Sequence, residues 1–407
     1  MQAPRHVRRS SRLWLIALML CAATALLFPA LSDAAKKPKK AKRGGAAYTE
    51  TNEPDNKVVV YRRGADGSLT EIQRVDTGGA GVVGNPPFGQ GFLDSNGAVE
   101  LTKNGRLLFV VNAGDDTISS FRVKRNGRLR LADTAPSGGD HPTSIDTRKG
   151  LLYVLNVDSN DISGLRYTKK GRMTPLSNST RELATPQGTI PGAGLPTPFA
   201  DQVLFSPNGK VLTVPERLSN NFMGQLDTFR IGRDGRPGQA QANASNGFIP
   251  FGMEWDNHGH LIVANGGPPP NFSPGTGSSY SLSGTTLTPI DNQLAGDDAT
   301  CWLAITNDGK YAFMINQPPG RAGSVSRFRI SGDGHLTLLG ITPTSGSSAD
   351  TALSRNSKYL FVQNIILPGE TGNATIDRYR VHSDGSLTHL GLTDSGVPGS
   401  ASGFAAR

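Results

Sequence analysis

The stretch CWLAITNDGKYAFMINQPPGRAGSVSRFRISGDGHLTLL, residues 301–339, decides the fold of this chain. It holds four short runs of alternating or apolar residues, at 303–306, 310–315, 324–330 and 336–339. Asn307-Asp308-Gly309 and Asp333-Gly334 separate two pairs of these runs. Such turns predict antiparallel hairpins, because Asn, Asp and Gly accept the positive φ angles that tight turns require. Four strands make one small twisted sheet, which needs similar neighbours to bury its faces.

The same unit recurs along the chain. The turn between its third and fourth strands appears seven times, at Asp66-Gly67, Asn126-Gly127, Lys170-Gly171, Asp234-Gly235, Ser283-Gly284, Asp333-Gly334 and Asp384-Gly385. The turn between its first and second strands appears only six times, at Asn104-Gly105, Lys149-Gly150, Asn208-Gly209, His258-Gly259, Asp308-Gly309 and Asn356-Ser357. The missing turn would join a strand in 399–407 to a strand in 46–52.

These two counts predict an all-β fold, a seven-bladed β-propeller of four-stranded antiparallel blades over residues 46–407. In the last blade the C-terminus supplies the innermost strand and the N-terminus supplies the other three. Pairing of the two ends closes the ring and removes the open edge of an isolated sheet. Six blades with ragged ends is the rival count. The 50 Gly and 27 Pro residues in 407 agree with an all-β repeat protein.

The N-terminus predicts export. Four arginines precede an apolar run at 13–31, and small residues follow it at Ser32, Ala34 and Ala35. This order is typical of a secretory signal peptide, here residues 1–35, and places the mature protein in the periplasm or outside the cell. An uncleaved membrane anchor is the alternative, but Pro29 and the small residues favour cleavage and no stable membrane insertion afterwards.

The positive charge of the chain lies at the same end. Residues 1–45 carry ten of the 42 Lys and Arg residues and one of the 33 Asp and Glu residues, so the whole excess of +9 lies there. The tract KKPKKAKRGG at 36–45 is predicted to be a flexible tether. The neutral body excludes a nucleic-acid partner. After cleavage only Cys301 is left, so no intramolecular disulfide forms. We expect a monomer.

Insertions are expected on one face of the ring. They lie at 78–96, 184–198, 218–224 and 266–277. All belong to connections between second and third strands, or from an outer strand to the next inner strand. These connections open on one side of a propeller, so that side is the predicted binding face. A small-molecule ligand, a glycan or a protein is the expected partner there.

Each second strand is predicted to end in a polar residue: Asn52, Asn112, Asn156, Glu216, Asn265, Asn316 and Asn364. An Asn amide both donates and accepts hydrogen bonds, so it ties the strand end to the loop. Glu216 breaks this pattern, and Arg217 follows it. Two interpretations stay open: Glu216 forms a local pair or accepts backbone N–H bonds, or it faces the channel and handles a ligand or proton.

The strings LFSPNGKVLTVPE (204–216), NGRLLFVVNAGDDTISSFRV (104–123) and NSKYLFVQN (356–364) make residues 46–407 resemble the lactonase family of seven-bladed propellers. That family includes propeller-type 6-phosphogluconolactonase and carboxymuconate cyclase. The resemblance implies a His near the start of one inner strand, a Glu on another inner strand and an Arg after a second-strand Asn. Here Asp201, Trp302 and Gln317 stand at those positions.

Other residues are candidates for the replaced roles. Lactone opening needs an acid or base and a group that stabilises the oxyanion. Asp201 and Glu216 are the catalytic candidates, and Arg217, His141, Trp302 and Gln317 are the candidates for binding. A turn-capping role for His141 is the alternative to a base. The histidines are scattered, so we predict no metal site, and no glycine-rich loop opens a helix, so we predict no cofactor.

Two functions are consistent with the sequence. The first is an exported lactonase-like enzyme that acts on a small lactone or its carboxylate with a remodelled residue set. The second is a non-catalytic propeller that binds a small molecule, glycan or protein on the loop-rich face, because propellers often serve as platforms. The replaced catalytic residue types favour the second function, and the family resemblance favours the first.

Overall fold

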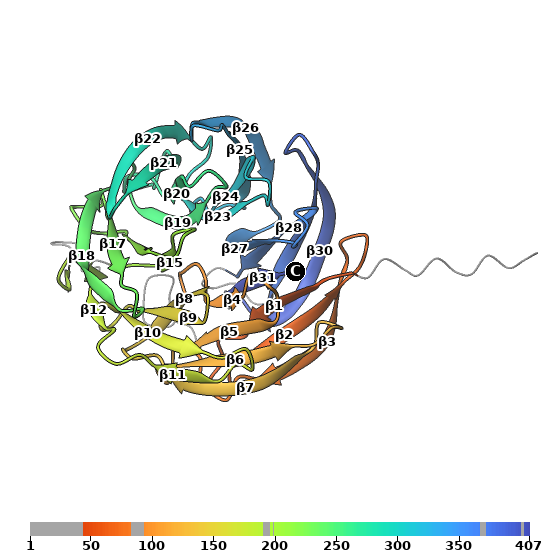
Figure 1. Ribbon diagram of the computed structural model, residues 1–407. Coiled ribbons are helices and arrows are strands. Elements are labelled where there is room, and N and C mark those ends of the chain that lie inside the picture. The colour runs from red at the N-terminus through yellow and green to blue at the C-terminus, as the bar shows by residue number, and fades with distance from the viewer. Residues whose placement is uncertain (1–43, 83–92, 190–195, 198, 367–371, 400–402) are drawn as a thin grey trace, which may run out of the picture. The chain divides into compact units, whose positions relative to one another are not determined.

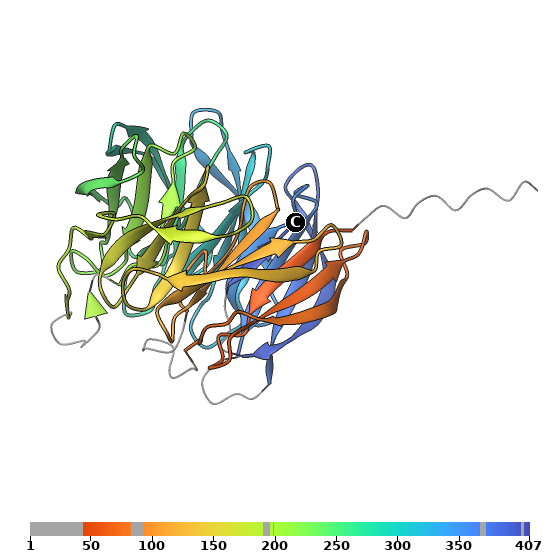
Figure 2. The same cartoon turned by 60° about the horizontal axis from the view of Figure 1, so that its bottom comes forward.

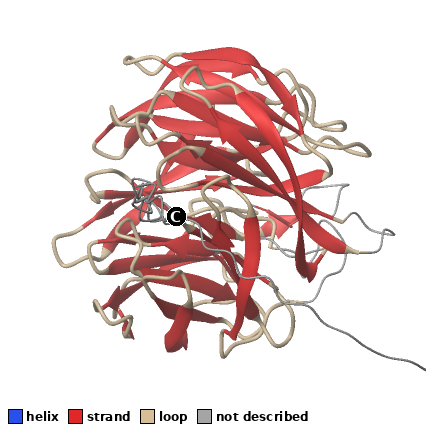
Figure 3. Ribbon diagram, turned by 90° about the vertical axis from the view of Figure 1, so that its right-hand side faces the viewer, coloured by secondary structure: helices blue, strands red, loops and turns tan. Residues whose placement is uncertain are grey.

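The computed structural model describes residues 44–82, 93–189, 196–197, 199–366, 372–399 and 403–407. The chain divides into the units Met1–Ala41 and Lys42–Arg407, and the second unit is the propeller. The predicted signal peptide and the predicted tether up to residue 43 lie outside the described residues. Figure 3 shows that the described part consists of strands and loops without helices. It therefore holds no helix long and apolar enough to cross a membrane.

Seven four-stranded antiparallel sheets form the ring, as predicted, and each is a blade (Figure 1). The innermost strands are β4 (Val99–Leu101), β8 (Pro142–Arg148), β15 (Leu204–Phe205), β19 (Pro250–Trp255), β23 (Thr300–Ile305), β27 (Ser347–Leu353) and β31 (Phe404–Ala406). The second strands are β5 (Leu107–Asn112), β9 (Leu151–Asn156), β16 (Val211–Glu216), β20 (Leu261–Asn265), β24 (Tyr311–Asn316), β28 (Tyr359–Ile365) and β1 (Ala46–Glu50).

The two outer layers follow the same order. The third strands are β6 (Thr117–Val123), β10 (Asp161–Tyr167), β17 (Gln225–Ile231), β21 (Thr276–Ser283), β25 (Ser324–Ile330), β29 (Asn373–Val381) and β2 (Lys57–Arg63). The outermost strands are β7 (Leu129–Pro136), β11 (Met173–Pro175), β18 (Pro237–Ala244), β22 (Thr286–Leu294), β26 (Leu336–Pro343), β30 (Leu387–Pro398) and β3 (Leu69–Asp76). β12 (Arg181–Glu182) also pairs with β10, and β13 (Gly188–Thr189) with β14 (Pro196–Thr197) makes a separate ribbon.

The two ends of the chain close the ring, which confirms the predicted seventh blade and removes the six-blade alternative. β31 pairs antiparallel with β1 through Ala47↔Ala406, Tyr48↔Ala405 and Thr49↔Phe404. The Arg407 N–H also donates to the Ala46 carbonyl at 2.9 Å. Phe404 is buried, and its ring lies 6.0 Å from the ring of Phe361 in the preceding blade. The closing strand therefore joins the hydrophobic core between two blades.

Hydrophobic packing between neighbouring blades holds the ring together, and Figure 2 shows the blades side by side from a tilted view. Second strands such as LLFVVN in β5 are buried along their whole length. Tyr48 donates its hydroxyl to the Gly127 carbonyl of the next blade, and Tyr153 does the same to Gly235. Both glycines have positive φ, 89° and 87°. The predicted Asp-Gly and Asn-Gly turns thus shape the hairpins, and their carbonyl groups also accept hydrogen bonds from a neighbouring blade.

The strand-end asparagines have the predicted structural role. In four blades the Asn amide nitrogen donates to a serine hydroxyl on the third strand of the same blade, in the pairs Asn112–Ser119, Asn156–Ser163, Asn265–Ser278 and Asn316–Ser326. Asn364 donates to Asp377 at the corresponding position. Asn52 departs from the prediction, because β1 already ends at Glu50. Its φ of 53° lies in the left-handed region, which cannot continue a strand. The placement of Asn52 at the strand end was therefore wrong, although its amide exchanges two hydrogen bonds with the Val82 backbone.

Candidate functional site

A repeated irregularity at the start of the inner strands positions the candidate site. The register shifts after the first pair in β8 and β23 and after the second pair in β27, which leaves Thr143, Cys301 and Ala349 without an opposite partner. β-bulges of this kind turn a side chain away from its regular direction and often occur beside active sites. In the β15 blade an isolated bridge joins Ala200 to Glu216, and Asp201 is the next residue. Asp201 therefore occupies the bulge position of its blade.

Arg217 lies beside Asp201 and is held on several sides. Its Nη1 donates to Asp94 Oδ2 at 2.7 Å, and its Nε donates to the Phe199 carbonyl at 3.2 Å. Nε also lies 3.5 Å from Asp201 Oδ1. The guanidinium carbon stands 4.2 Å from the ring centre of Phe199 and 4.4 Å from that of Phe251. The cation is therefore paired with carboxylates and stacked on aromatic rings, two ways of stabilising a buried arginine.

The segment that carries Asp94 bridges several inner strands. Ser95 Oγ donates to the Thr143 carbonyl at 2.7 Å, and the Asn96 N–H donates to the Asp201 carbonyl at 3.1 Å. Trp302 Nε1 donates to the Ser95 carbonyl at 3.1 Å. Residues 94–97 thus contact the starts of three inner strands, and they bring Asp94 to Arg217. This segment belongs to the long insertion predicted at 78–96, of which residues 83–92 lie outside the described part.

Asp201 has the electrostatics of a carboxyl group that holds its proton. The residue is fully buried, and neither carboxyl oxygen makes a hydrogen bond of good geometry. Burial raises the pKa of Asp201 well above its usual range, and Arg217 lowers that pKa only in part. Asp94 raises it further, whereas Asn96 lies near enough to favour the charged form. A protonated carboxyl beside an Arg–Asp ion pair can serve as a proton donor.

Glu216 belongs to a different polar cluster. Its Oε1 accepts the Thr185 N–H at 3.0 Å, and its Oε2 accepts hydroxyl bonds from Thr185 and Ser219 at 2.5 Å each. On the third strand Asp227 stands where four other blades have a serine. Burial and then Glu216 raise the pKa of Asp227 to about 8. Asp227 therefore keeps its proton to a higher pH than an exposed carboxyl group, in a cluster that anchors the chain at 184–185.

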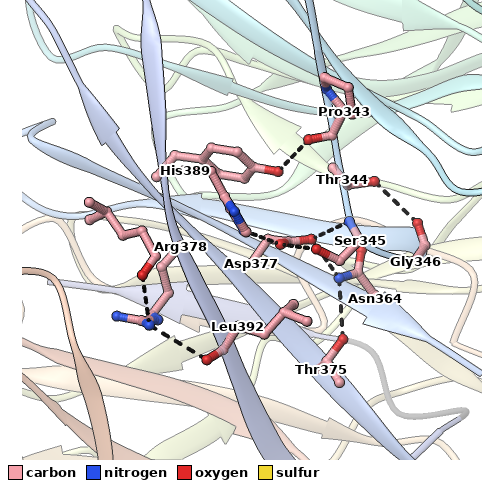
Figure 4. Close-up of polar contacts among 12 residues, drawn as sticks. Pro343, Thr344, Ser345, Gly346, Asn364, Thr375, Asp377, Arg378, His389 and Leu392 are labelled. Carbon is pink, nitrogen blue, oxygen red and sulfur yellow. Dashed lines mark hydrogen bonds and ion pairs between the residues drawn. The ribbon is translucent and has the colours of Figure 1, made fainter.

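The β27–β30 blade shows the corresponding position with an amide in place of Glu216 (Figure 4). Asn364 Nδ2 donates to Asp377 Oδ2 at 2.8 Å, so here the carboxylate meets a donor. Asp377 also accepts bonds from the Ser345 N–H and hydroxyl, and His389 Nε2 lies 2.6 Å from its Oδ1. An amide at this position donates a hydrogen bond, which a carboxylate cannot do. The carboxyl pair of Glu216 and Asp227 thus occupies the position at which an asparagine joins the second and third strands in other blades.

The other sequence candidates divide between the Arg217 site and its surroundings. Trp302 is buried, and its ring packs edge-on against Phe251 with 5.0 Å between the ring centres. It therefore supports Phe251, the ring on which Arg217 stacks. Gln317 Nε2 donates to Ser347 Oγ at 3.1 Å in a different blade interface. His141 has a φ of 57°, and its Nδ1 lies 3.1 Å from Asp158 Oδ2, which fits the turn-capping alternative. The structure thus brings together Asp201, Arg217 and Trp302.

A family comparison adds to this geometry. The sequence model of the family "Lactonase, 7-bladed beta-propeller" matches residues 2–190 and 278–400, more than half of the chain. The chain belongs to this lactonase family. The matched regions leave out 191–277, and that gap holds Asp201, Glu216, Arg217 and Phe251. Membership therefore covers the architecture, whereas the segment that builds most of the candidate site is not matched.

Solved structures agree with the lactonase-family fold. A protein from Bacteroides uniformis assigned as a 6-phosphogluconolactonase is 17% identical, with a TM-score of 0.67 over 89% of this chain and 99% of its own. The periplasmic gluconolactonase of Pseudomonas aeruginosa is 18% identical, with a TM-score of 0.64 over 88% of this chain and 98% of its own. No curated protein sequence matches the chain. At these identities the similarity shows the fold of the lactonase-family propeller.

Sequence reasoning missed Asp94 and a set of carboxyl groups on the inner strands. Burial raises the pKa of Asp146, Glu254 and Asp350 to about 7 each. Asp146 Oδ2 accepts the Phe205 N–H of the next blade at 2.6 Å, and Glu254 Oε2 accepts the Ile305 N–H at 2.6 Å. These side chains tie neighbouring inner strands together. Acidic residues within the inner strands were the signal that could have revealed them.

Metal chemistry has no evident site in the part of the lactonase-family chain that the structure describes. No group of three or more His, Cys, Asp or Glu side chains is placed there to hold a metal ion. Cys301 is buried, and burial raises the pKa of its thiol well above the usual range. A thiol of this kind is a poor nucleophile.

Proposed function

We propose that this propeller is an exported hydrolase of small lactones, with its active site where Asp201, Arg217 and Asp94 meet. The observation that carries the proposal is the fully buried Asp201, whose carboxyl oxygens make no good hydrogen bond and lie beside a paired arginine. Lactonase-family membership supports the reaction class. The order of basic, apolar and small residues at 5–35 supports export, as does the periplasmic description of one structural relative.

The proposed reaction uses Asp201 as an acid. Water attacks the carbonyl carbon of the lactone, and the bond between that carbon and the ring oxygen breaks. Asp201 donates its proton to the leaving ring oxygen, which becomes a hydroxyl group, and the attacking water releases a proton that restores Asp201. Arg217 stabilises the negative charge on the carbonyl oxygen, because a cation in a poorly solvated site is most effective where charge develops. The product is an open-chain hydroxy acid.

The test is hydrolysis across a panel of five- and six-membered lactones, measured against buffer at pH 6.5. Asp201→Asn removes the transferable proton and keeps the shape of the side chain, so we expect kcat to fall about 10²- to 10⁴-fold, the usual contribution of general acid catalysis. Asp227→Asn is the matched control, because Asp227 is also buried with a raised pKa but lies in the Glu216 cluster. Equal rates for Asp201→Asn and the parent protein would contradict the assigned role.

A second function is favoured by the fact that most hydrogen-bond donors of the Arg217 guanidinium group already have partners. Its ion pair with Asp94, its bond to the Phe199 carbonyl and its two ring contacts leave few free N–H groups. A non-catalytic propeller that binds a small molecule, a glycan or a protein would use this cluster only as a brace. In that case no lactone of the panel is hydrolysed faster than in buffer.

A further inference from the structure

The charges of the propeller are distributed unevenly, although Lys and Arg balance Asp and Glu over residues 46–407. In each blade the turn between strands one and two and the turn between strands three and four lie at the same end, because the strands are antiparallel. In the neighbouring blades β4–β7 and β8–β11 these turn ends are LTKNGRL (101–107), RVKRNGRLR (122–130), TRKGL (147–151) and RYTKKGRM (166–173). They hold thirteen Lys and Arg residues and no Asp or Glu. We call these four segments the basic turn face.

The cations of the basic turn face are exposed and have no acidic partner. Twelve of the thirteen residues are exposed, and Arg148 is partly buried. None of them forms an ion pair with a carboxylate in the part of the chain that the structure describes. The two blades lie side by side (Figure 1), and the Ser120 hydroxyl donates to the Gly171 carbonyl across their interface at 2.6 Å. Clustered like charges repel one another, and an anionic partner would relieve that repulsion.

The turns themselves do not require this positive charge. Asn126 and Lys170 stand where four other blades have an aspartate in the turn between strands three and four, namely Asp66, Asp234, Asp333 and Asp384. Asp66 Oδ1 accepts the Ser68 N–H at 3.0 Å, and Asn126 Oδ1 accepts the Arg128 N–H at 3.2 Å in the same way. The amide thus keeps the hydrogen bond of the turn and removes its negative charge.

Arg407 brings the start of the described chain to the basic turn face. Its Nη1 donates to the Gly105 carbonyl and its Nη2 to the Arg125 carbonyl, both at 3.2 Å. The Arg407 N–H donates to the Ala46 carbonyl at the start of β1. In the sequence a tract with six Lys and Arg residues, 36–43, directly precedes Gly44. The point at which this tract joins the propeller therefore lies beside the basic turn face.

The composition of the basic turn face suits a lipid surface. Its exposed residues include no aromatic ring, and none of the exposed large apolar side chains of the described chain lies in it. Single-stranded nucleic acid is bound by stacking on aromatic rings, and insertion into a bilayer needs apolar side chains. Adhesion to anionic headgroups needs only clustered cations. Duplex nucleic acid also attracts cations, but the proposed export brings the protein to membrane surfaces instead.

We propose that the basic turn face binds the surface of an anionic phospholipid bilayer by electrostatic attraction, without insertion. Arg217 follows a second strand and so lies at the opposite end of the sheets. Docking through the basic turn face therefore leaves the candidate site facing away from the bilayer. This interaction goes beyond lactone hydrolysis, and its test does not involve that reaction.

The experiment is cosedimentation of the protein lacking residues 1–35 with lipid vesicles. We expect binding to phosphatidylcholine vesicles that contain about one third phosphatidylglycerol, and none to pure phosphatidylcholine. Binding at about 50 mM NaCl should be lost at about 500 mM, because salt screens exposed charges. A fourfold variant removes four cations and keeps their aliphatic stems, so we expect it to bind at least about 100-fold more weakly. Its changes are Lys124→Gln, Arg125→Gln, Lys169→Gln and Lys170→Gln.

A second fourfold variant with the same change in net charge is the matched control. It replaces exposed cations at the turn ends of blades β23–β26 and β27–β30, where Asp308, Asp333 and Asp384 lie among them. Its binding should stay within about threefold of the parent protein. Thermal unfolding checks that both variants keep the fold. The control changes are Lys310→Gln, Arg329→Gln, Arg355→Gln and Lys358→Gln.

Four results would overturn the proposal. The first is no binding of the folded parent protein to the anionic vesicles at low salt. The second is equal weakening by both fourfold variants, which would make net charge the cause. The third is a protein of residues 44–407 that does not bind, which would assign the lipid contact to the tract at 36–43. The fourth is tighter binding to duplex DNA than to the vesicles at the same salt, which would assign the basic turn face to nucleic acid.

Discussion

Arg217 Nη1 lies 2.7 Å from Asp94 Oδ2, although the two residues are 123 positions apart in the chain. Arg217 follows the second strand of one blade, whereas Asp94 lies on the insertion that precedes the inner strand of another. Only 6% of the Arg217 side chain and 11% of the Asp94 side chain are exposed. At that depth an unpaired charge is costly, so the ion pair fixes the insertion onto the inner strands.

We expect Asp94→Asn to destabilise the protein by about 3–5 kcal/mol, the usual cost of removing one partner of a buried ion pair. Arg217→Gln should have a similar effect. The double variant should cost clearly less than the two single changes together, because no unpaired charge is left. Urea unfolding of the four proteins measures this coupling. Strictly additive effects would show that the ion pair contributes nothing.

The carboxyl pair of Glu216 and Asp227 predicts that stability depends on pH. The pKa of Asp227 is about 8 in the folded protein, above the usual value of 3.8. The folded state therefore holds this proton more tightly than the unfolded state, and stability falls as pH rises from about 4 to 8. Asp227→Asn supplies an amide that cannot lose a proton in this range. We expect it to be more stable than the parent at pH 9 and similar at pH 4.5, by chemical denaturation.

A surface variant serves as the control for this pH profile. Asp333→Asn changes an exposed turn residue whose pKa is lowered by hydrogen bonds from the Ser331 hydroxyl and nearby backbone. A lowered pKa affects only the acidic range, so this variant should keep the parent profile between pH 5 and 9. If Asp227→Asn shows the same slope as the parent over that range, Asp227 does not carry the proton.

The raised pKa of Asp201 predicts that the rate of lactone opening depends on pH. Burial raises the pKa of Asp201 well above its usual range, so its acid form persists into the neutral range. We expect kcat for lactone opening to fall as pH rises through that pKa, because the proton donor is lost. The residual rate of Asp201→Asn should lack this alkaline fall. If the rate of the parent protein, after subtraction of the rate in buffer, rises steadily with pH, Asp201 is not the acid.

Closure of the ring predicts the effect of a C-terminal truncation. Removing residues 399–407 deletes β31 and exposes β1 as an open edge. The loss of the buried Phe404 side chain alone should cost about 3–5 kcal/mol. We therefore expect a sharp fall in Tm, measured by calorimetry. Adding a short Gly/Ser tail after Arg407 lengthens the chain without removing β31, and it should leave Tm unchanged.

Local chemistry explains why much of the fold was predictable. Each turn glycine needs only its own positive φ, and each strand needs only its own alternation of residues. Counting such turns between Asp66-Gly67 and Asp384-Gly385 was enough to find seven blades and the shared last blade. The same reasoning placed the end of this strand at Asn52, two residues beyond its actual end at Glu50, because a left-handed residue beyond the strand end has no clear sequence signal.

The candidate site was less predictable from the sequence. Its residues come from different blades, and a pairing between distant segments leaves no local pattern. Asp201 was found because it replaces an expected histidine, and Arg217 because it follows the break at Glu216. Asp94 was missed, since nothing near it in sequence marks it as the partner of a cation. Glu216 was selected because it breaks the repeat. Its hydrogen bonds to Thr185 and Ser219 place it in a separate cluster, outside the one around Arg217.

The amino-acid sequence by itself determined the number of blades, their strand order and the use of both termini in one sheet, because turns and strand periods depend on neighbours in the chain. Only the tertiary structure decided which charges meet. Closing the ring sets the distances between inner strands, and burial then determines that Asp201 holds its proton while Asp94 pairs with Arg217.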